Sequence, residues 1–393
     1  MVGAGPTGLW TAIQIKKRRP DLDVQLYERH QEYQRSHVLK LENASLLYYS
    51  KTNRDGPEAA FYKEVTGKRV EGIMDEFQIV ANSTFIRTHD LEKALKNYAE
   101  ALGIKVSYET IEDPAALMAK HPECKRFIAA DGAHSKMRRA LLGEDAVDDL
   151  PLQHVVEIKY EAEGRAGRLG DLKGGYRTNK LLSHMAFEYV GKEKNGKTPV
   201  TLRFFLDKKT YDVLPQASFK DPLTLGDKRL PETLAKDIRT YMNVRKAKAG
   251  ETYAEGSAKI SKLTLSMYAA KKFALVTDGG QGWFFVGDAA MGVPYFRALN
   301  SGMIVGSQLA LILTRDLLST KAKVASYNGI RPLDIQYEFN LARGKDLGLN
   351  IYDAFRRMRA DAPLQTNKWD DQEAEAFQET TRKAAGKKPG PRP

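Results

Sequence analysis

The sequence GAGPTG at residues 3–8 decides the fold class of this chain. It fits the pattern G-x-G-x-x-G, and Leu9, Ala12 and Ile13 after it share one face of a predicted helix. Glycines in such a turn let the backbone approach a pyrophosphate, whose charge is stabilised by free N–H groups at the helix N-terminus. The pattern alone is weak, because glycine-rich turns also arise by chance.

A carboxylate follows the turn at the spacing that a dinucleotide site requires. Val24 and Leu26 alternate with polar neighbours as a short strand ending at Glu28, 20 residues after the last glycine of the turn. A carboxylate there can accept hydrogen bonds from both ribose hydroxyls of an adenosine. Only Met1 and Val2 precede the turn, so the strand before it is expected to be very short. The turn and Glu28 together predict a dinucleotide site.

Helix and strand patterns alternate in the first 150 residues, as in βαβ units, and return after residue 267. Thr88 or Asp90 can cap the first helix of this set. The predicted elements are a helix over 91–102, strands at 127–130 and 283–286, and a helix over 301–318.

The middle of the chain, 151–267, has a different pattern. Apolar and polar residues alternate at 156–160, 185–189 and 200–206. This alternation predicts antiparallel strands with one face toward solvent.

Composition excludes several classes of protein. The chain has 393 residues, 42% of them hydrophobic, and its single cysteine, Cys124, excludes an internal disulfide. Seven scattered histidines form no Cys/His cluster at metal-ligand spacing, so we expect no metal site. The net charge of +12 favours anionic ligands. The densest basic run, 382–392, stands among Gly and Pro and indicates a solvated tail rather than a nucleic-acid site.

No segment predicts a membrane span. The longest apolar stretch, 303–313, is shorter than the roughly 20 residues that cross a bilayer, and polar residues interrupt it. No signal peptide precedes the first motif. We therefore expect a cytoplasmic protein.

Three separated segments together resemble the FAD domain of class A flavoprotein monooxygenases, the p-hydroxybenzoate hydroxylase fold. They are GAGPTG with Glu28, DGAHSKMR at 131–138, and GDAA at 287–290 followed by Pro294, Asn300 and Gly302. The second matches the family's D-G-x-x-S-x-x-R and the third its G-D-A-A…P…N-x-G, in the family's order and spacing. The segment RSHVLKL at 35–41 is most similar to R-H-N-V-L-H-L of MICAL monooxygenase domains. No segment resembles the actin-binding or zinc-binding modules of those enzymes, so actin oxidation is not carried over.

The resemblance implies an α/β fold: a Rossmann-like FAD-binding domain, an inserted antiparallel-sheet substrate domain and a helical C-terminus. The expected ranges are 1–150 and 268–330 for the FAD-binding domain, 151–267 for the substrate domain with 66–86 able to join it, 331–378 for C-terminal helices, and 379–393 for a disordered basic tail.

The resemblance also implies a site for non-covalent FAD. Asp288 would accept from a ribityl or ribose hydroxyl, or would instead cap the next helix. Arg87 could hold FAD or only face solvent. Asp131 and Arg138 fit a mainly structural role beneath the cofactor. The full set implied to bind the cofactor is Gly3, Gly5, Pro6, Thr7, Gly8, Glu28, Arg29, Arg35, His37, Val38, Arg87, Asp131, Gly287, Asp288, Pro294, Leu299, Asn300 and Ser301.

For the substrate pocket, Tyr295 and Phe296 are the preferred candidates. Tyr176, His184, Phe187 and Phe204 are further candidates on the predicted sheet, although Phe187 and Phe204 fit core positions as well.

The activity implied is that of an FAD-dependent monooxygenase consuming NADPH or NADH. It would insert one oxygen atom of O₂ into an aromatic or electron-rich small molecule through a flavin C4a-hydroperoxide. The sequence contains no catalytic triad or metalloprotease motif, which fits an enzyme whose cofactor carries the chemistry. Two alternatives stay open: an FAD-dependent reductase or dehydrogenase of the same fold, and a basic flavin-binding interaction protein without turnover.

Overall fold

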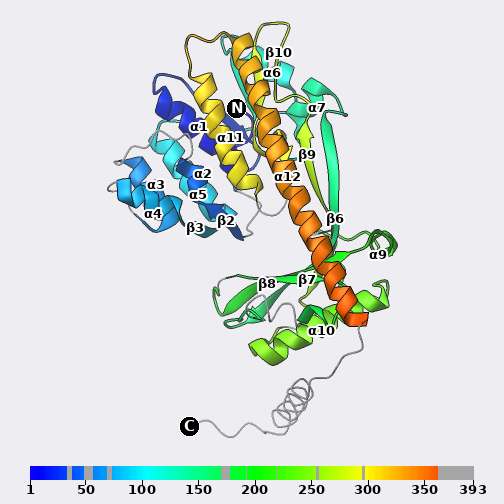
Figure 1. Cartoon of the computed structure of the whole chain (residues 1–393). Helices are drawn as coiled ribbons and strands as arrows, with labels where there is room; N and C mark the ends of the chain where they lie inside the picture. The colour runs from blue at the N-terminus through cyan, green and yellow to red at the C-terminus, as the bar shows by residue number, and fades with distance from the viewer. Residues whose placement is uncertain are drawn as a thin grey trace, which may run out of the picture. The chain divides into compact units, whose positions relative to one another are not determined.

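The computed structural model describes residues 1–32, 38–47, 56–68, 73–169, 178–191, 193–218, 220–253, 256–293 and 297–361 (Figure 1). The chain forms two compact units, unit 1 with Met1–Leu152 and Ser266–Gly344, and unit 2 with Gln153–Leu265 and Lys345–Pro393. The sequence analysis expects the FAD-binding domain to end at residue 330 and separate C-terminal helices to follow. In the structure one helix, α12 (Thr320–Asp361), extends across this boundary. The expected tail, 379–393, lies outside the described residues.

Unit 1 is built on a mainly parallel sheet, as its α/β pattern predicts. β1 pairs in parallel with β4 and β5 with β11, while β10 is antiparallel to β11. Val2 bridges in parallel to Tyr27 and Ala129, so a one-residue strand joins the two halves of the sheet. The strands are β1 Gln25–Glu28, β4 Lys105–Tyr108, β5 Arg126–Ala129, β10 Ala274–Val276 and β11 Gly282–Phe285.

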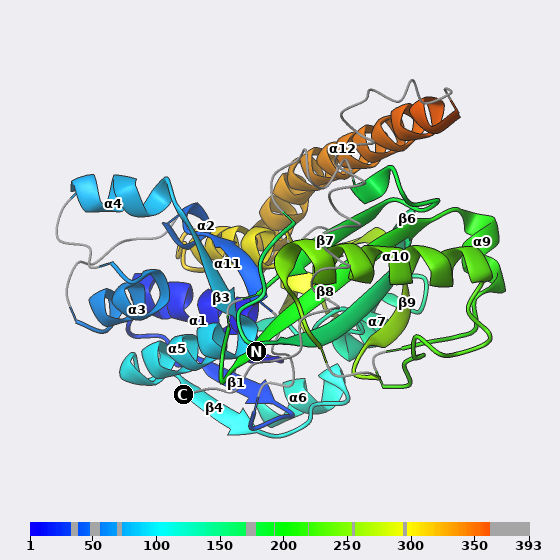
Figure 2. The same cartoon turned by 90° about the horizontal axis from the view of Figure 1, so that it is seen from below.

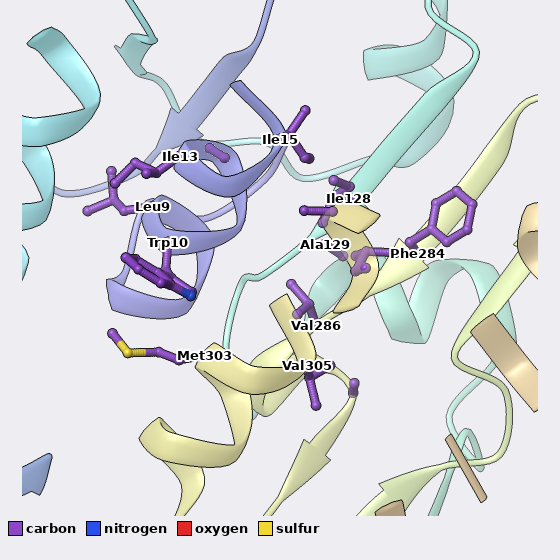
Figure 3. Packing of buried hydrophobic residues seen from close by; sticks show 14 of the residues in the cluster. Leu9, Trp10, Ile13, Ile15, Ile128, Ala129, Phe284, Val286, Met303 and Val305 are labelled. Atoms are coloured by element: carbon purple, nitrogen blue, oxygen red, sulfur yellow. The ribbon is translucent and has the colours of Figure 1, made fainter. Parts of the chain in front are cut away.

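Helices α1 (Pro6–Arg18) and α11 (Ala298–Leu313) pack against each other in unit 1. Figure 3 shows Leu9, Trp10 and Met303 among the buried side chains around these helices. The contact is close because α11 presents glycine to α1. A Cβ on Gly302 would lie 2.7 Å from Thr7 Oγ1, and one on Gly306 would lie 2.4 Å from Thr11 Oγ1.

The remaining elements of unit 1 flank this sheet and these helices. They are α2 Ala44–Leu47, α3 Pro57–Thr66, α4 Ile73–Val80, α5 Thr88–Ala101, α6 Pro114–Lys120, α7 Lys136–Leu142, the antiparallel pair β2 Val38–Glu42 and β3 Ser83–Arg87, the short 3₁₀ helix η1 Gly287–Ala289 and β12 Met291–Gly292.

Two helix boundaries differ from the predictions. α5 has Arg87 at its N-cap with no side-chain cap, and Thr88 is buried in its first turn, so neither Thr88 nor Asp90 occupies the cap position. α11 begins at Ala298 rather than Ser301 and ends at Leu313 rather than Leu318. At its end, the backbone N–H and the hydroxyl of Thr314 both donate to the Ala310 carbonyl, at 3.1 and 2.8 Å.

The alternating segments form an antiparallel sheet, as predicted, in the order β12-β9-β6-β8-β7. Every second residue of β8 is buried, and these residues pack against α10 in the core of unit 2. Figure 2 shows α10 lying across β7 and β8. The sequence analysis did not predict α10. The bounds are β6 Val147–Glu163, β7 Ala186–Val190, β8 Lys197–Leu206, β9 Lys259–Ala270, α9 Lys208–Val213 and α10 Glu232–Ala249.

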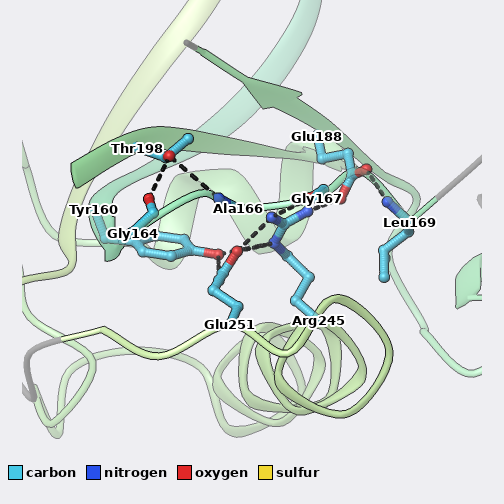
Figure 4. A network of polar contacts seen from close by, with 9 residues as sticks. All are labelled: Tyr160, Gly164, Ala166, Gly167, Leu169, Glu188, Thr198, Arg245 and Glu251. Atoms are coloured by element: carbon cyan, nitrogen blue, oxygen red, sulfur yellow. Dashed lines mark hydrogen bonds and ion pairs between the residues drawn. The ribbon is translucent and has the colours of Figure 1, made fainter. Parts of the chain in front are cut away.

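A buried arginine ties α10 to this sheet (Figure 4). Arg245 Nε donates to Tyr160 Oη and to Glu251 Oε2, each at 3.0 Å, and Arg245 also pairs with Glu188. Its second terminal nitrogen donates to the Gly167 carbonyl at 3.0 Å. Burial of this cation is tolerated because its carboxylate partners and hydrogen bonds replace water.

Candidate functional site

The glycine turn leaves open space beside the start of α1. Gly3 has a φ of +97°, and a Cβ there would lie 2.3 Å from the Ala130 carbonyl oxygen. A Cβ on Gly8 would lie 2.2 Å from the Gly3 carbonyl oxygen. A Cβ on Gly5 would meet no atom within 4 Å. Gly3 and Gly8 are therefore required by the fold itself, whereas Gly5 is required only by something that approaches the turn.

The N-terminus of α1 is suited to an anion. Gly5 is its N-cap, no side chain caps it, and its first turn contains no acidic residue. The N–H groups of a first helical turn have no partner within the helix, and the helix dipole places partial positive charge there. A pyrophosphate next to Gly5 would therefore be stabilised by backbone groups alone.

Glu28 lies at the end of β1, beside the same turn. Its Oε2 accepts from the backbone N–H of Ala4 (2.8 Å) and its Oε1 from that of His30 (3.1 Å). These bonds fix the carboxylate, and each oxygen still has acceptor capacity for a hydroxyl.

Asp131 follows the neighbouring strand β5. Its Oδ2 accepts from the backbone N–H of Met137 (3.2 Å), while its buried Oδ1 has no hydrogen-bond partner in the described part of the chain. A buried acceptor without a partner costs free energy, so a donor at this place would be favoured.

Arg138 and Tyr268 bind the backbone of the GDAA turn through hydrogen bonds. The buried guanidinium of Arg138 donates to the carbonyls of Ala289 (2.8 Å) and Ala133 (2.9 Å) and lies 5.5 Å from the centre of the Tyr268 ring. The Tyr268 hydroxyl donates to the Asp288 carbonyl (2.7 Å). These contacts fix the backbone of η1.

Asp288 stands within η1, directly after β11. The N-cap residues of η1 and α11, Val286 and Arg297, make no side-chain cap hydrogen bond. Gly287 before it has a φ of +61°, and a Cβ on it would lie 2.9 Å from Thr7 Cγ2. The GDAA turn and the start of α1 are therefore in contact.

These segments surround one cavity of about 410 Å³ within unit 1. This volume is typical of a small-molecule or cofactor site. Many of the residues that the resemblance implies for cofactor binding line this cavity. They are Gly3, Gly5, Pro6, Thr7, Gly8, Glu28, Arg29, Asp131, Gly287, Asp288 and Leu299.

Other residues of that set do not line the cavity. Asn300 accepts from the backbone N–H of Glu42 (2.9 Å) and donates to the Lys40 carbonyl (3.0 Å), and the Ser301 hydroxyl donates to Glu338 (2.9 Å). Both side chains attach the start of α11 to its neighbours. Arg87, at the end of β3, is the N-cap of α5. Arg87, Asn300 and Ser301 are thus absent from the lining, and the side chain of Val38 lies outside the described part of the chain. Arg35, His37, Pro294, Tyr295 and Phe296 lie outside the described residues.

The sequence analysis missed several residues that line the cavity. Ligands of open parallel sheets bind beyond the carboxyl ends of the strands, and the residues after β1, β4 and β5 lie there. That rule, applied to β4 as well as β1, would have found His30, Glu109 and Thr110, but not Thr88 and Glu92, which belong to α5. The missed polar residues are Tyr27, His30, Thr88, Glu92, Glu109, Thr110, His134 and Lys136.

One of the missed residues has a perturbed pKa. Burial raises the pKa of Glu92, and the ammonium of Lys96, 2.6 Å away, opposes the effect. Glu92 Oε2 is buried and has no hydrogen-bond partner among the described residues.

The further substrate candidates on the sheet of unit 2 have different environments. Phe204 is fully buried in the core of unit 2, and His184 is buried with its Nδ1 2.8 Å from Asp237 Oδ2. Phe187 is half-buried and makes an edge-to-face contact with Phe205, with ring centres 5.7 Å apart. Tyr176 lies outside the described residues. Phe204 is thus a core residue.

Within the described ranges, no helix is long and apolar enough to cross a membrane. The same ranges contain no group of three or more His, Cys, Asp or Glu residues able to hold a metal ion.

Models of protein families and curated protein sequences gave no match to this chain. Solved structures do match it. The tetrameric form of 2-methyl-3-hydroxypyridine-5-carboxylic acid oxygenase is 15% identical, with a TM-score of 0.52 over 92% of each chain. CtdE in complex with FAD and a substrate is 15% identical, with a TM-score of 0.54 over 92% of this chain and 90% of that chain. The Diels-Alderase PyrE3 is 13% identical, with a TM-score of 0.51 over 90% of this chain and 76% of that chain.

Similarity at these identities shows the fold. The chain has the fold of these structures, which agrees with the fold implied by its three motifs. PyrE3 has the same fold and is described as a Diels-Alderase, so the reaction has to be argued from the site.

Proposed function

We propose that this protein is an FAD-dependent monooxygenase that uses NADPH or NADH and O₂ to oxygenate an aromatic or electron-rich small molecule. The observation that carries the proposal is the convergence of three distant motifs on one cavity. The glycine turn with Glu28, the segment from Asp131, and the GDAA turn all contribute to its lining.

The residues present suit FAD in particular. The α1 N-terminus and the space beside Gly5 suit a pyrophosphate, and Glu28 suits the ribose of the adenosine. Asp131 and Asp288 offer carboxylates to further hydroxyl donors of the cofactor. CtdE, of the same fold, contains FAD, which supports this choice.

Bound FAD would supply the redox and oxygen-transfer chemistry. The protein's contribution is binding and placement. The Arg138–Tyr268 contacts hold the Asp288 backbone, and the contact of Thr7 with Gly287 keeps the GDAA turn against the start of α1. Tyr295 and Phe296 are proposed to line the substrate pocket, and the similarity of 35–41 to MICAL domains remains a local one.

A pair of glycine variants tests the cofactor site. Gly5→Val adds a side chain that meets no protein atom near its Cβ, so we expect normal folding and loss of FAD. Gly8→Ala is the contrasting variant, because its Cβ would lie 2.2 Å from the Gly3 carbonyl oxygen and should lower stability. FAD released per mole of protein and circular dichroism are the measurements. A folded Gly5→Val protein with full FAD occupancy would remove the turn from the site.

Turnover separates the proposal from its two alternatives. The wild-type protein loaded with FAD is assayed for NAD(P)H oxidation stimulated by members of an aromatic compound library, and products are analysed after reaction under ¹⁸O₂. One labelled oxygen atom in the product supports the monooxygenase. Substrate turnover without label supports a reductase or dehydrogenase, and flavin that NAD(P)H does not reduce supports a binding protein without turnover.

A further inference from the structure

Glu92 is a buried carboxylate on the wall of the cavity in unit 1. It stands in the second turn of α5, is 3% exposed, and lines the cavity together with Thr88, one helical turn before it. Acidic side chains are almost never fully buried unless they are paired. The burial of Glu92 therefore has its cause either in the packing of α5 or in what the cavity binds.

One oxygen of this carboxylate is bound within the protein. The ammonium of Lys96 lies 2.6 Å from Glu92 Oε1, and it also donates to the Gln31 carbonyl at 3.1 Å. Burial would lower the pKa of Lys96, but the hydrogen bond and charge of Glu92 raise it above its ordinary value, so Lys96 stays protonated. Lys96 thus fixes the Glu92 side chain and ties α5 to the segment that follows Glu28.

The other oxygen of the carboxylate has no such partner. Glu92 Oε2 is buried and accepts no hydrogen bond from any residue that the structure describes. An unsatisfied buried acceptor costs free energy, which a donor on a bound molecule would recover. Because Glu92 lines the cavity, an N–H or O–H group of a ligand in the cavity is the donor that suits it.

The position of Glu92 indicates which part of a dinucleotide lies beside it. Burial raises the pKa of Glu92, Lys96 opposes this effect, and the charge of Glu28 adds to it, so the two carboxylates are close enough to interact. In the site described above, Glu28 suits the ribose of the adenosine. A pyrophosphate would be repelled by a second carboxylate, whereas adenosine is neutral and offers ribose hydroxyls and an adenine amino group as donors.

We propose that Glu92 is a second acceptor for the adenosine part of the bound dinucleotide, receiving a hydrogen bond from a ribose hydroxyl or from the adenine amino group. The proposal rests on the FAD site proposed above. It gives Glu92 a part in ligand selection, because a ligand without the matching donor would leave this buried acceptor unsatisfied.

Four flavin dinucleotides test the proposal on the full chain, with dissociation constants measured by quenching of flavin fluorescence. They are FAD, flavin inosine dinucleotide, in which an oxo group replaces the adenine amino group, and the analogues of FAD made with 2′-deoxyadenosine and with 3′-deoxyadenosine. Glu92→Ala should bind FAD roughly tenfold more weakly than wild type does, the scale for losing a hydrogen bond to a charged group. It should bind the analogue that lacks the donor to Glu92 as tightly as wild type does, and this analogue distinguishes the base from the ribose.

Two further variants separate contact with the ligand from support of the helix. Glu92→Gln preserves the size of the side chain, so it should fold as wild type does and bind FAD several-fold more weakly. Glu100→Gln is the matched control, because Glu100 is exposed on the same helix, and it should bind all four ligands as wild type does.

The outcomes that contradict the proposal are distinct from those that contradict the FAD site. Equal loss of affinity for FAD and for all three analogues in Glu92→Ala would mean that Glu92 only holds α5 in place, and it would overturn the proposal. Unchanged affinity for FAD in both Glu92 variants would overturn it as well. A wild-type protein that binds no FAD would refute the cofactor site itself, and this proposal with it.

Discussion

Gly5 and Gly8 belong to one short pattern, yet the structure gives them different reasons to be glycine. A side chain at position 8 would collide with the carbonyl oxygen of Gly3, whereas a Cβ at position 5 would extend into open space. The sequence pattern could predict that both are needed, but it could not separate folding from binding. Asn300 is a second example. The motif predicts that it binds the cofactor, but its side chain is hydrogen-bonded to the backbone of Lys40 and Glu42. The direction of a side chain depends on tertiary packing, which a sequence motif does not specify.

Asp288 should contribute to cofactor binding without contributing much to the fold. We expect Asp288→Ala to weaken FAD binding by about 1 to 3 kcal/mol, the cost of leaving a buried hydroxyl of the cofactor unpaired. Isothermal titration of the apoprotein measures this. Asp288→Asn, which keeps an acceptor oxygen, is the control and should lose less. Unchanged affinity in the alanine variant would show that the carboxylate does not contact the cofactor.

Asp237 in unit 2 should make stability depend on pH. Burial alone would raise the pKa of its carboxyl, but hydrogen bonds from the His184 ring and from the backbone N–H groups of Ser183 and His184 hold that pKa below its ordinary value. A carboxyl with a lowered pKa in the folded state stabilises the protein above its unfolded pKa of about 4, and this contribution is lost as the pH falls through the folded pKa.

We therefore expect Asp237→Asn to lower the free energy of unfolding by about 1 to 3 kcal/mol at pH 7, because it replaces a charged acceptor of three hydrogen bonds. Urea unfolding should show the gap between variant and wild type closing as the pH falls from about 5 to 3. A gap that stays constant over this range would mean that the carboxylate charge does not stabilise the fold.

At the scale of elements, the periodic segments were predictable and the connections between them were not. β8 alternates in sequence and in burial because one face of its sheet packs on a core. α10 escaped prediction because its apolar residues are mixed with charged ones, among them Asp237 and Arg245, which are buried by bonding to other elements. The sequence does not distinguish a buried charged residue from an exposed one. Hydrophobic periodicity therefore fails to predict a helix whose buried face contains ion pairs in place of apolar contacts.

The start of α11 depends on a residue from α12. Glu338 accepts two hydrogen bonds from the guanidinium of Arg297, each 2.8 Å long, and one from the Ser301 hydroxyl. The hydrogen bond and charge of Glu338 raise the pKa of Arg297, which therefore stays protonated. Since Arg297 is the N-cap of α11 and Ala298 and Leu299 line the cavity, this pair holds one wall of the site.

Glu338→Ala should accordingly lower the free energy of unfolding by about 1 to 3 kcal/mol and weaken FAD binding at the same time. Thermal melts of apoprotein and titration with FAD provide the two values. Glu338→Gln, which retains one acceptor for Arg297, should lie between wild type and Glu338→Ala in both. Loss of stability with unchanged FAD affinity would show that the first turn of α11 does not need this pair.

At the scale of the whole molecule, each of the two units has its own hydrophobic core, and the cavity belongs to unit 1. A ligand that binds only the folded state slows the opening of the part that it binds. Excess FAD should therefore slow hydrogen exchange in α1, β5 and α11 by at least tenfold and leave α10 and β8 nearly unchanged. Mass spectrometry of peptic fragments resolves the two sets of amides. Equal slowing in both would show that the units open together.

The close contact of α1 with α11 also bears on how fast a cofactor can be loaded. Gly302 and Gly306 let the two helices approach so closely that a Cβ at either position would collide with Thr7 or Thr11, and both helices contribute residues to the cavity wall. A receptor whose walls are already in place loses little conformational freedom on association, so less of the binding free energy is spent on ordering it. Uptake of FAD by the apoprotein should then follow a single exponential whose rate rises linearly with FAD concentration, as measured by quenching of flavin fluorescence. A cell that makes the chain before the cofactor is available would then accumulate an apoprotein that we expect to bind FAD without a further folding step.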